Sequence, residues 1–136
     1  MPKYDARGFI VELSPSEIIV VGTNRQGAHL AGAAWLARCQ FGLEPGFAEG
    51  LCGQTYAFPT MDGLDALRYC IPRFYRCADE HPRSSFYMTA LGCGIAGHTA
   101  AQVAPLFADR PPNVILPPEF VAVLTDTDTE NLGCGK

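Results

Sequence analysis

The chain has 136 residues, of which 48% are hydrophobic and 18% are charged, and its formal net charge is −4. This length fits one domain with a single core. The acidic balance and the lack of a run rich in Lys or Arg argue against nucleic acid and anionic membranes as partners. No apolar stretch reaches membrane-span length and the N-terminal residues lack the form of a signal peptide, so we expect a cytoplasmic protein.

The predicted elements alternate between strands and helices along the chain. Short runs of β-branched and aromatic residues predict strands, and apolar residues at helical spacing predict helices. Pro72 predicts a kink or a new helix start near Ile71. The predicted strands are residues 9–13, 17–21, 54–58, 85–91 and 113–116, and the predicted helices are residues 30–40, 64–78 and 100–107.

The remaining segments are predicted to be irregular. Residues 43–53 hold three glycines and a proline, which is typical of a loop. Residues 119–124 have no clear pattern. Residues 125–136 are polar and acidic, so we expect a disordered tail after a single domain formed by residues 1–124.

This alternation predicts an α/β fold with three layers, in which helices cover both faces of a mixed, largely parallel central sheet. Glycine-bearing turns follow the strands that end near Val21 and Leu91. In open α/β sheets, ligands bind beyond the carboxyl ends of the strands, where such turns meet. We therefore expect the functional site between these turns.

The chemistry of both turns favours an anionic ligand. Glycine lets the backbone approach a ligand closely, and the first N–H groups of a helix attract phosphate. The spacing matches neither the dinucleotide fingerprint nor the P-loop, and simple turn geometry is the alternative explanation. The candidate ligand-binding residues are Gly22, Thr23, Asn24 and Gly27 in the first turn, and Gly92, Cys93, Gly94, Ile95, Ala96 and Gly97 in the second.

Four side chains are candidate catalytic groups. The amide of Asn24 could orient a ribose hydroxyl or a water, or could simply close an Asx turn. His29 and His98 could act as acid or base, and a surface or capping role is the alternative for each. Glu49 could act as general base or hold a ribose, or could be a solvated loop acid.

The chain has six cysteines, and none of them forms a C-x-x-C pair. We expect most of them to be small buried hydrophobic residues and expect no metal site. Cys93 stands out because it lies between glycines near a helix start, where a lowered pKa would make it a nucleophile. The alternative is that a tight turn needs a small residue there.

The motifs VVGTNRQGAHLAGAA, FGLEPGFAEGLCGQTYAFPT and TALGCGIAGHTAAQVAPLF resemble a group of small uncharacterised bacterial and phage-associated proteins. More distantly, the first and third motifs resemble the glycine loops of macro domains, which bind ADP-ribose. This resemblance implies a macro-domain-like fold in which both turns clamp a nucleotide diphosphate. The Gly-Asp-Ile-Thr turn of macro domains is not in this sequence, and Ala31 stands where catalytic members often carry an acidic residue.

We therefore expect a protein that binds, and could hydrolyse, a nucleotide-derived ligand such as ADP-ribose or a related NAD metabolite, in a manner similar to ADP-ribosyl hydrolases. No separate cofactor is expected, and the sequence leaves the oligomeric state open. The alternatives are a phage-associated or host interaction protein without a small-molecule ligand, and a Cys93-dependent hydrolase or transferase. The expected compartment is the cytoplasm of a bacterium or of a phage-infected host cell.

Overall fold

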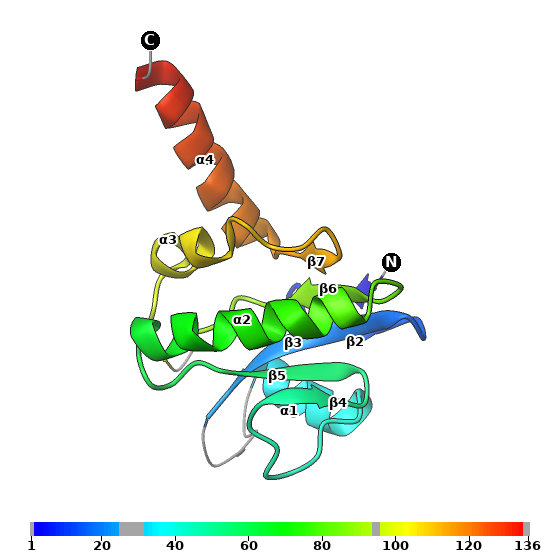
Figure 1. Cartoon of the computed structure of the whole chain (residues 1–136). Helices are drawn as coiled ribbons and strands as arrows, with labels where there is room; N and C mark the ends of the chain where they lie inside the picture. The colour runs from blue at the N-terminus through cyan, green and yellow to red at the C-terminus, as the bar shows by residue number, and fades with distance from the viewer. Residues whose placement is uncertain (1, 25–31, 94–95, 135–136) are drawn as a thin grey trace.

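The computed structural model describes residues 2–24, 32–93 and 96–134 (Figure 1). The elements in chain order are β1 (Lys3–Tyr4), β2 (Ile10–Glu12), β3 (Glu17–Thr23), α1 (Gly32–Gln40), β4 (Gly50–Cys52), β5 (Thr55–Pro59), α2 (Leu64–Glu80), β6 (Ser85–Met88), α3 (Ala100–Val103), the 3₁₀ helix η1 (Ala104–Phe107), β7 (Val114–Ile115) and α4 (Pro118–Cys134).

The central sheet has five strands in the order β4-β5-β3-β6-β7. Strands β5, β3, β6 and β7 run parallel, and only β4 runs antiparallel to its neighbour. Val20 in the middle of β3 lies opposite Tyr56 of β5 and Met88 of β6. Because β3 is covered on both faces, its β-branched run is almost entirely buried, as expected for a central parallel strand.

Alternate residues of β3 belong to separate cores. Ile18 and Val20 pack with α2, whereas Ile19 and Val21 pack with α1. The helices α2, α3 and α4 with η1 cover one face of the sheet, and α1 with the β1–β2 hairpin covers the other. The expected three-layer α/β fold with a mostly parallel mixed sheet is thus confirmed.

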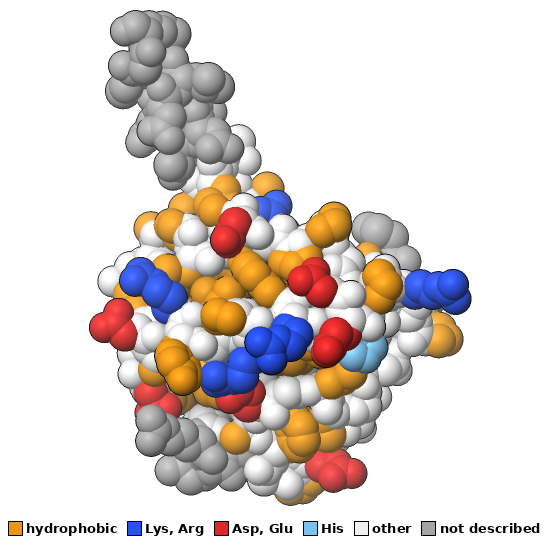
Figure 2. All heavy atoms as spheres, in the orientation of Figure 1, with side chains coloured by type: hydrophobic (Ala, Val, Ile, Leu, Met, Phe, Trp, Pro, Cys, Tyr) orange, Lys and Arg blue, Asp and Glu red, His pale blue; other side chains and the backbone are white. Residues whose placement is uncertain are grey.

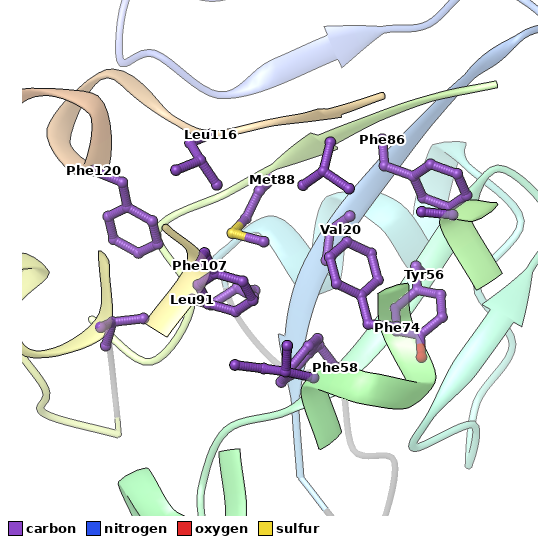
Figure 3. Packing of buried hydrophobic residues seen from close by; sticks show 14 of the residues in the cluster. Val20, Tyr56, Phe58, Phe74, Phe86, Met88, Leu91, Phe107, Leu116 and Phe120 are labelled. Carbon is purple, nitrogen blue, oxygen red and sulfur yellow. The ribbon is translucent and has the colours of Figure 1, made fainter. Parts of the chain in front are cut away.

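The larger core is aromatic and centres on Phe74 of α2 (Figure 3). Its ring centroid lies 4.9 Å from that of Tyr56, 5.7 Å from that of Phe58 and 5.9 Å from that of Phe86. Tilted and edge-on contacts of this kind stabilise a core beyond simple area burial. The outer side of α2 is solvated, and Figure 2 shows basic and acidic side chains interspersed on this face of the molecule.

The helical connections from β3 to β5 and from β5 to β6 run over opposite faces of the sheet. The chain passes from β3 through α1 on one face to reach β5, and from β5 through α2 on the other face to reach β6. The direction of winding therefore reverses between the neighbouring strands β3 and β6. In doubly wound sheets this reversal opens a crevice beyond the carboxyl ends of the two strands.

The structure differs from the sequence predictions in the segment 43–53 and at Pro72. The segment 43–53 contains the short strand β4, which pairs with β5 as an antiparallel edge. The chain can turn back into this strand because Gly42 and Gly53 lie in close contact. A Cβ on Gly53 would lie only 2.8 Å from the Cα of Gly42. Helix α2 continues through Pro72, which is exposed, so no new helix starts at Ile71. An exposed proline leaves the carbonyl one turn earlier open to water.

At the chain end, α4 extends from Pro118 to Cys134. Pro118 suits the first turn of a helix, where its missing N–H would have no partner. Phe120 is fully buried in the larger core, and Val123 and Leu124 pack against it. These contacts supply the hydrophobic anchor for a segment that shows little pattern in the sequence.

Candidate functional site

A cavity of about 660 Å³ opens where β3 and β6 end. We call it the switch-point crevice. Residues 22–24 form one wall and residues 88–93 form the opposite wall, so both predicted turns reach it. Thr60 and Met61, which follow β5, and residues 115–119, which follow β7, complete this end. The volume lies within the range typical of small-molecule sites.

Gly22 is required in this wall because of Thr60. A Cβ on Gly22 would lie 2.9 Å from Thr60 Oγ1, closer than real Cβ contacts allow. The backbone N–H of Thr60 donates to the Thr23 carbonyl at 3.0 Å, which holds the two strand ends together. Thr60 does not cap α2, whose N-cap is Gly63 without a side-chain hydrogen bond.

The Thr60 side chain is therefore available to a ligand. Thr60 is only 4% exposed and lines the crevice. Within residues 2–24, 32–93 and 96–134, its hydroxyl has no hydrogen-bond partner. Buried hydroxyl groups are nearly always hydrogen-bonded, to protein, to water or to a ligand. The Thr60 hydroxyl is thus a buried polar group that can form a hydrogen bond with a ligand in the crevice.

The hydroxyls of the other threonines in the walls hold the strand ends in place. Thr23 donates to the carbonyl of Ala48. Thr89 donates to the carbonyl of Val20 at 2.7 Å, and its N–H donates to the same oxygen at 3.1 Å. These bonds tie the first residue after β6 to β3. Both walls are therefore fixed by bonds that do not involve a ligand.

The second turn is tight and rich in backbone donors. Gly92 has a φ of 74°, and a Cβ there would lie 3.1 Å from Cδ2 of His98, so a glycine is needed. His98 N–H donates to the Gly92 carbonyl at 2.8 Å, and Cys93 N–H donates to the Ala90 carbonyl at 3.2 Å. The N–H groups of Ala90 and Gly92 have no acceptor in the part of the chain that the structure describes.

The structure brings together many of the residues predicted from the sequence. His98 supports the second turn from behind, and neither it nor Gly97 lines the crevice. Gly27, His29, Gly94 and Ile95 lie outside the described residues. The predicted residues that line the crevice are Gly22, Thr23, Asn24, Gly92, Cys93 and Ala96.

Glu49, a predicted catalytic residue, does not line the switch-point crevice. Its carboxylate accepts hydrogen bonds from Arg73 Nε at 2.7 Å and Arg73 Nη2 at 3.1 Å. Both residues line a separate hollow of about 360 Å³ beside Tyr56. Glu49 directly precedes β4, and this antiparallel turn-back carries it to the edge of the sheet, where it pairs with α2.

The environment of Cys93 does not activate its thiol. Cys93 is half-buried, and burial raises the pKa of the thiol, with a further increase from the neighbouring carboxylate of Glu119. Its Sγ lies 3.6 Å from the Leu91 carbonyl, to which it donates. This is the opposite of the lowered pKa that a nucleophilic cysteine requires.

Several crevice residues were missed in the sequence, namely Glu119 at the start of α4 and the β1–β2 hairpin residues Tyr4 and Phe9. Tyr87 also lines the crevice and was not predicted to. Strand alternation places its side chain on the face opposite Phe86, so this residue could have been predicted from the sequence. The contribution of the hairpin gives no local signal. Among the described residues, no group of three His, Cys, Asp or Glu side chains could hold a metal ion.

Comparison of the chain with protein-family models, with curated proteins and with solved structures finds no match. The resemblance to macro domains therefore stays a prediction. Across the described residues, no helix combines the length and the apolar character needed to span a membrane.

Proposed function

We propose that the switch-point crevice binds a nucleotide-derived small molecule, such as ADP-ribose or a related NAD metabolite. The observation that carries this proposal is the open cavity of about 660 Å³ at the carboxyl ends of β3 and β6, which both glycine turns line. A protein whose turns served topology alone would be expected to fill this space with side chains. The open crevice thus favours a ligand over the alternative of a purely interacting protein.

Backbone N–H groups would bind the phosphate of such a ligand. No Lys or Arg of the described part of the chain lines the crevice. The N–H groups of Ala90 and Gly92 have no acceptor in the described part of the chain, and the small residues around them allow close approach. Successive backbone N–H groups in a turn form a concave anion site without a charged side chain.

Polar side chains at the same end would bind sugar hydroxyls. The buried Thr60 hydroxyl can donate to or accept from a ligand oxygen. Asn24 and the carboxylate of Glu119 also line the crevice and can orient hydroxyl groups. Since the pKa of Cys93 is raised rather than lowered, binding is better supported than covalent catalysis.

We also propose that the protein is located in the cytoplasm. Cys39, Cys52, Cys70, Cys77 and Cys93 are free thiols. Free thiols are typical of a reducing compartment. Among these five, Cys70 is buried, Cys52, Cys77 and Cys93 are half-buried and Cys39 is exposed, so the expectation that most cysteines are buried is wrong for these residues.

Isothermal titration calorimetry tests the proposal with ADP-ribose, AMP, NAD and cyclic ADP-ribose. We expect micromolar binding of at least one of them, which corresponds to about −8 kcal/mol. Thr60→Val removes the free hydroxyl with little change in shape, and loss of one hydrogen bond to the ligand should weaken binding about tenfold.

Thr55→Val is the matched control for this substitution. Thr55 is also buried, but its hydroxyl donates to the Phe41 carbonyl at 3.1 Å, and Thr55 does not line the crevice. It should therefore leave ligand affinity unchanged. Absence of heat with all four compounds would reject the proposal and favour the interaction protein.

A further inference from the structure

The switch-point crevice extends beyond the turns along the sheet face that also carries α1. In β6 and β7, Phe86 and Val114 point to the α2 side, so Tyr87 and Ile115 point to the α1 side. Tyr87 packs against the smaller core, to which α1 also contributes, and Ile115 is partly exposed. The β1–β2 hairpin packs near them, since Ile10 of β2 shares a core with Tyr87. The crevice therefore runs between the hairpin and the outer strands.

This part of the crevice has aromatic walls. Tyr4 and Phe9 line it from the hairpin, and Tyr87 and Ile115 line it from the sheet. We call these four residues the aromatic lobe. Tyr4 is 51% exposed and Ile115 is 36% exposed, so large apolar surfaces face the open space. Exposed apolar surface inside a cavity marks a binding site more often than a chance feature of the surface.

Contacts within the protein surround two of the rings of the lobe. Burial, and then the nearby carboxylate of the buried Glu17, raise the pKa of Tyr87. In the hairpin, Asp5 Oδ1 accepts from the N–H groups of Arg7 at 2.9 Å and Phe9 at 3.0 Å. The Arg7 guanidinium lies 4.7 Å from the centroid of the Phe9 ring. A preformed lobe lowers the entropy cost of binding.

The aromatic lobe and the second turn are separated by a length of β6 and the residues that follow it. Tyr87 and Ala90 are three residues apart, which corresponds to about 10 Å along an extended chain. A mononucleotide has its ring at one end and its phosphate at the other over a comparable length. The donors near Ala90 suit the phosphate, and the aromatic walls suit the ring.

We propose that the aromatic lobe binds the flat heteroaromatic ring of the ligand, with the phosphate at the second turn, so that the ligand class is a mononucleotide or a molecule that contains one. This inference rests on the proposed function. Two sources share the ring chemistry, a purine base and a nicotinamide ring. The lobe makes the ring a part of recognition, whereas the turns alone would bind any sugar phosphate.

Calorimetric titrations with AMP, nicotinamide mononucleotide and ribose 5-phosphate test this inference. Tyr4→Ala removes a half-exposed ring from the lobe and should not disturb folding. Because stacking of a base on an aromatic side chain is lost, affinity for the mononucleotide should fall about tenfold. Affinity for ribose 5-phosphate, which has no ring to stack, should not change. The tighter of AMP and nicotinamide mononucleotide identifies the source of the ring.

Tyr69→Ala is the matched control, because Tyr69 is a tyrosine that is 72% exposed on α2 and does not line the crevice. It should leave all three affinities unchanged. Equal affinity of wild type and Tyr4→Ala for both mononucleotides would overturn the lobe assignment, while a loss with Thr60→Val would still support the proposed function. Failure of the wild type to bind any of the three probes or ADP-ribose would overturn both.

Discussion

The contact between Gly22 and Thr60 makes the effect of one substitution depend on another. A Cβ on Gly22 would lie 2.9 Å from Thr60 Oγ1, 3.3 Å from its Cγ2 and 3.7 Å from its Cβ. Gly22→Ala therefore overpacks a buried wall, which typically costs about 1–3 kcal/mol of unfolding free energy. Thr60→Ala removes the oxygen and the methyl group, and only the ordinary 3.7 Å contact remains.

In the Thr60→Ala background the sign of the Gly22 substitution should reverse. Gly22 does not have a positive φ, so alanine can adopt its backbone conformation. The remaining effect is the reduced freedom of the unfolded chain, which stabilises by about 0.4–1 kcal/mol. The interaction energy between the two substitutions should therefore be about 1.5–4 kcal/mol.

Urea denaturation of the wild type, both single variants and the double variant measures this interaction energy. As a control, Gly22→Ala should be additive with Thr55→Ala, because Gly22 lies opposite Phe58 in the sheet and three residues beyond the partner of Thr55. Distant substitutions usually add within about 0.5 kcal/mol. Additivity of Gly22→Ala with Thr60→Ala would refute the close packing of the crevice wall.

Three further predictions concern the core, the thiol and the hairpin. Phe74→Ala should lower the unfolding free energy by about 3–5 kcal/mol in the same urea assay, because it leaves a cavity among the rings of the larger core, and a loss below about 1 kcal/mol would contradict that packing. The pH midpoint for alkylation of Cys93, followed by peptide mass spectrometry, should lie above its ordinary value of 9.0, since burial and then Glu119 raise its pKa, and a midpoint below 9.0 would revive the nucleophile hypothesis. The hydrogen bond from Arg7 lowers the pKa of Asp5 below 3.8, so its stabilisation of the hairpin tip is complete above pH 3.8 and is lost as the pH falls through the lower folded value. NMR titration of Asp5 and exchange of the Phe9 amide check this, and an Asp5 pKa at or above 3.8 would contradict it.

The sequence predicts the layers of this fold because its strongest patterns are local. The β-branched run 17–21 is buried on both faces, and apolar residues at helical spacing fill the core side of α2, so both elements follow from periodicity alone. Strand β4 escapes this reasoning because it is only three residues long and begins with a glycine. Pairing with β5 holds β4 in the sheet, and no local pattern in the sequence indicates this pairing.

The candidate site is predictable in part for the same reason. Glycines mark both turns, and the parallel sheet brings the turns to one edge. Thr60 was missed because a threonine before a helix is usually a cap. Tyr4 and Phe9 reach the crevice because a hairpin that is remote in sequence packs beside it. Glu49 lies outside the crevice because it precedes the antiparallel edge strand β4. These placements depend on tertiary contacts that one sequence does not reveal.

The most direct test of the central claim is a ¹H–¹⁵N NMR titration of the full chain with ADP-ribose. The account predicts that the largest shift changes fall on the amides of Gly22, Thr23, Thr60 and Gly92, which line one crevice. Saturable changes at these amides would place the ligand between the two turns. Saturable changes confined to the hollow around Glu49 and Arg73, or no changes at millimolar ligand, would contradict the account.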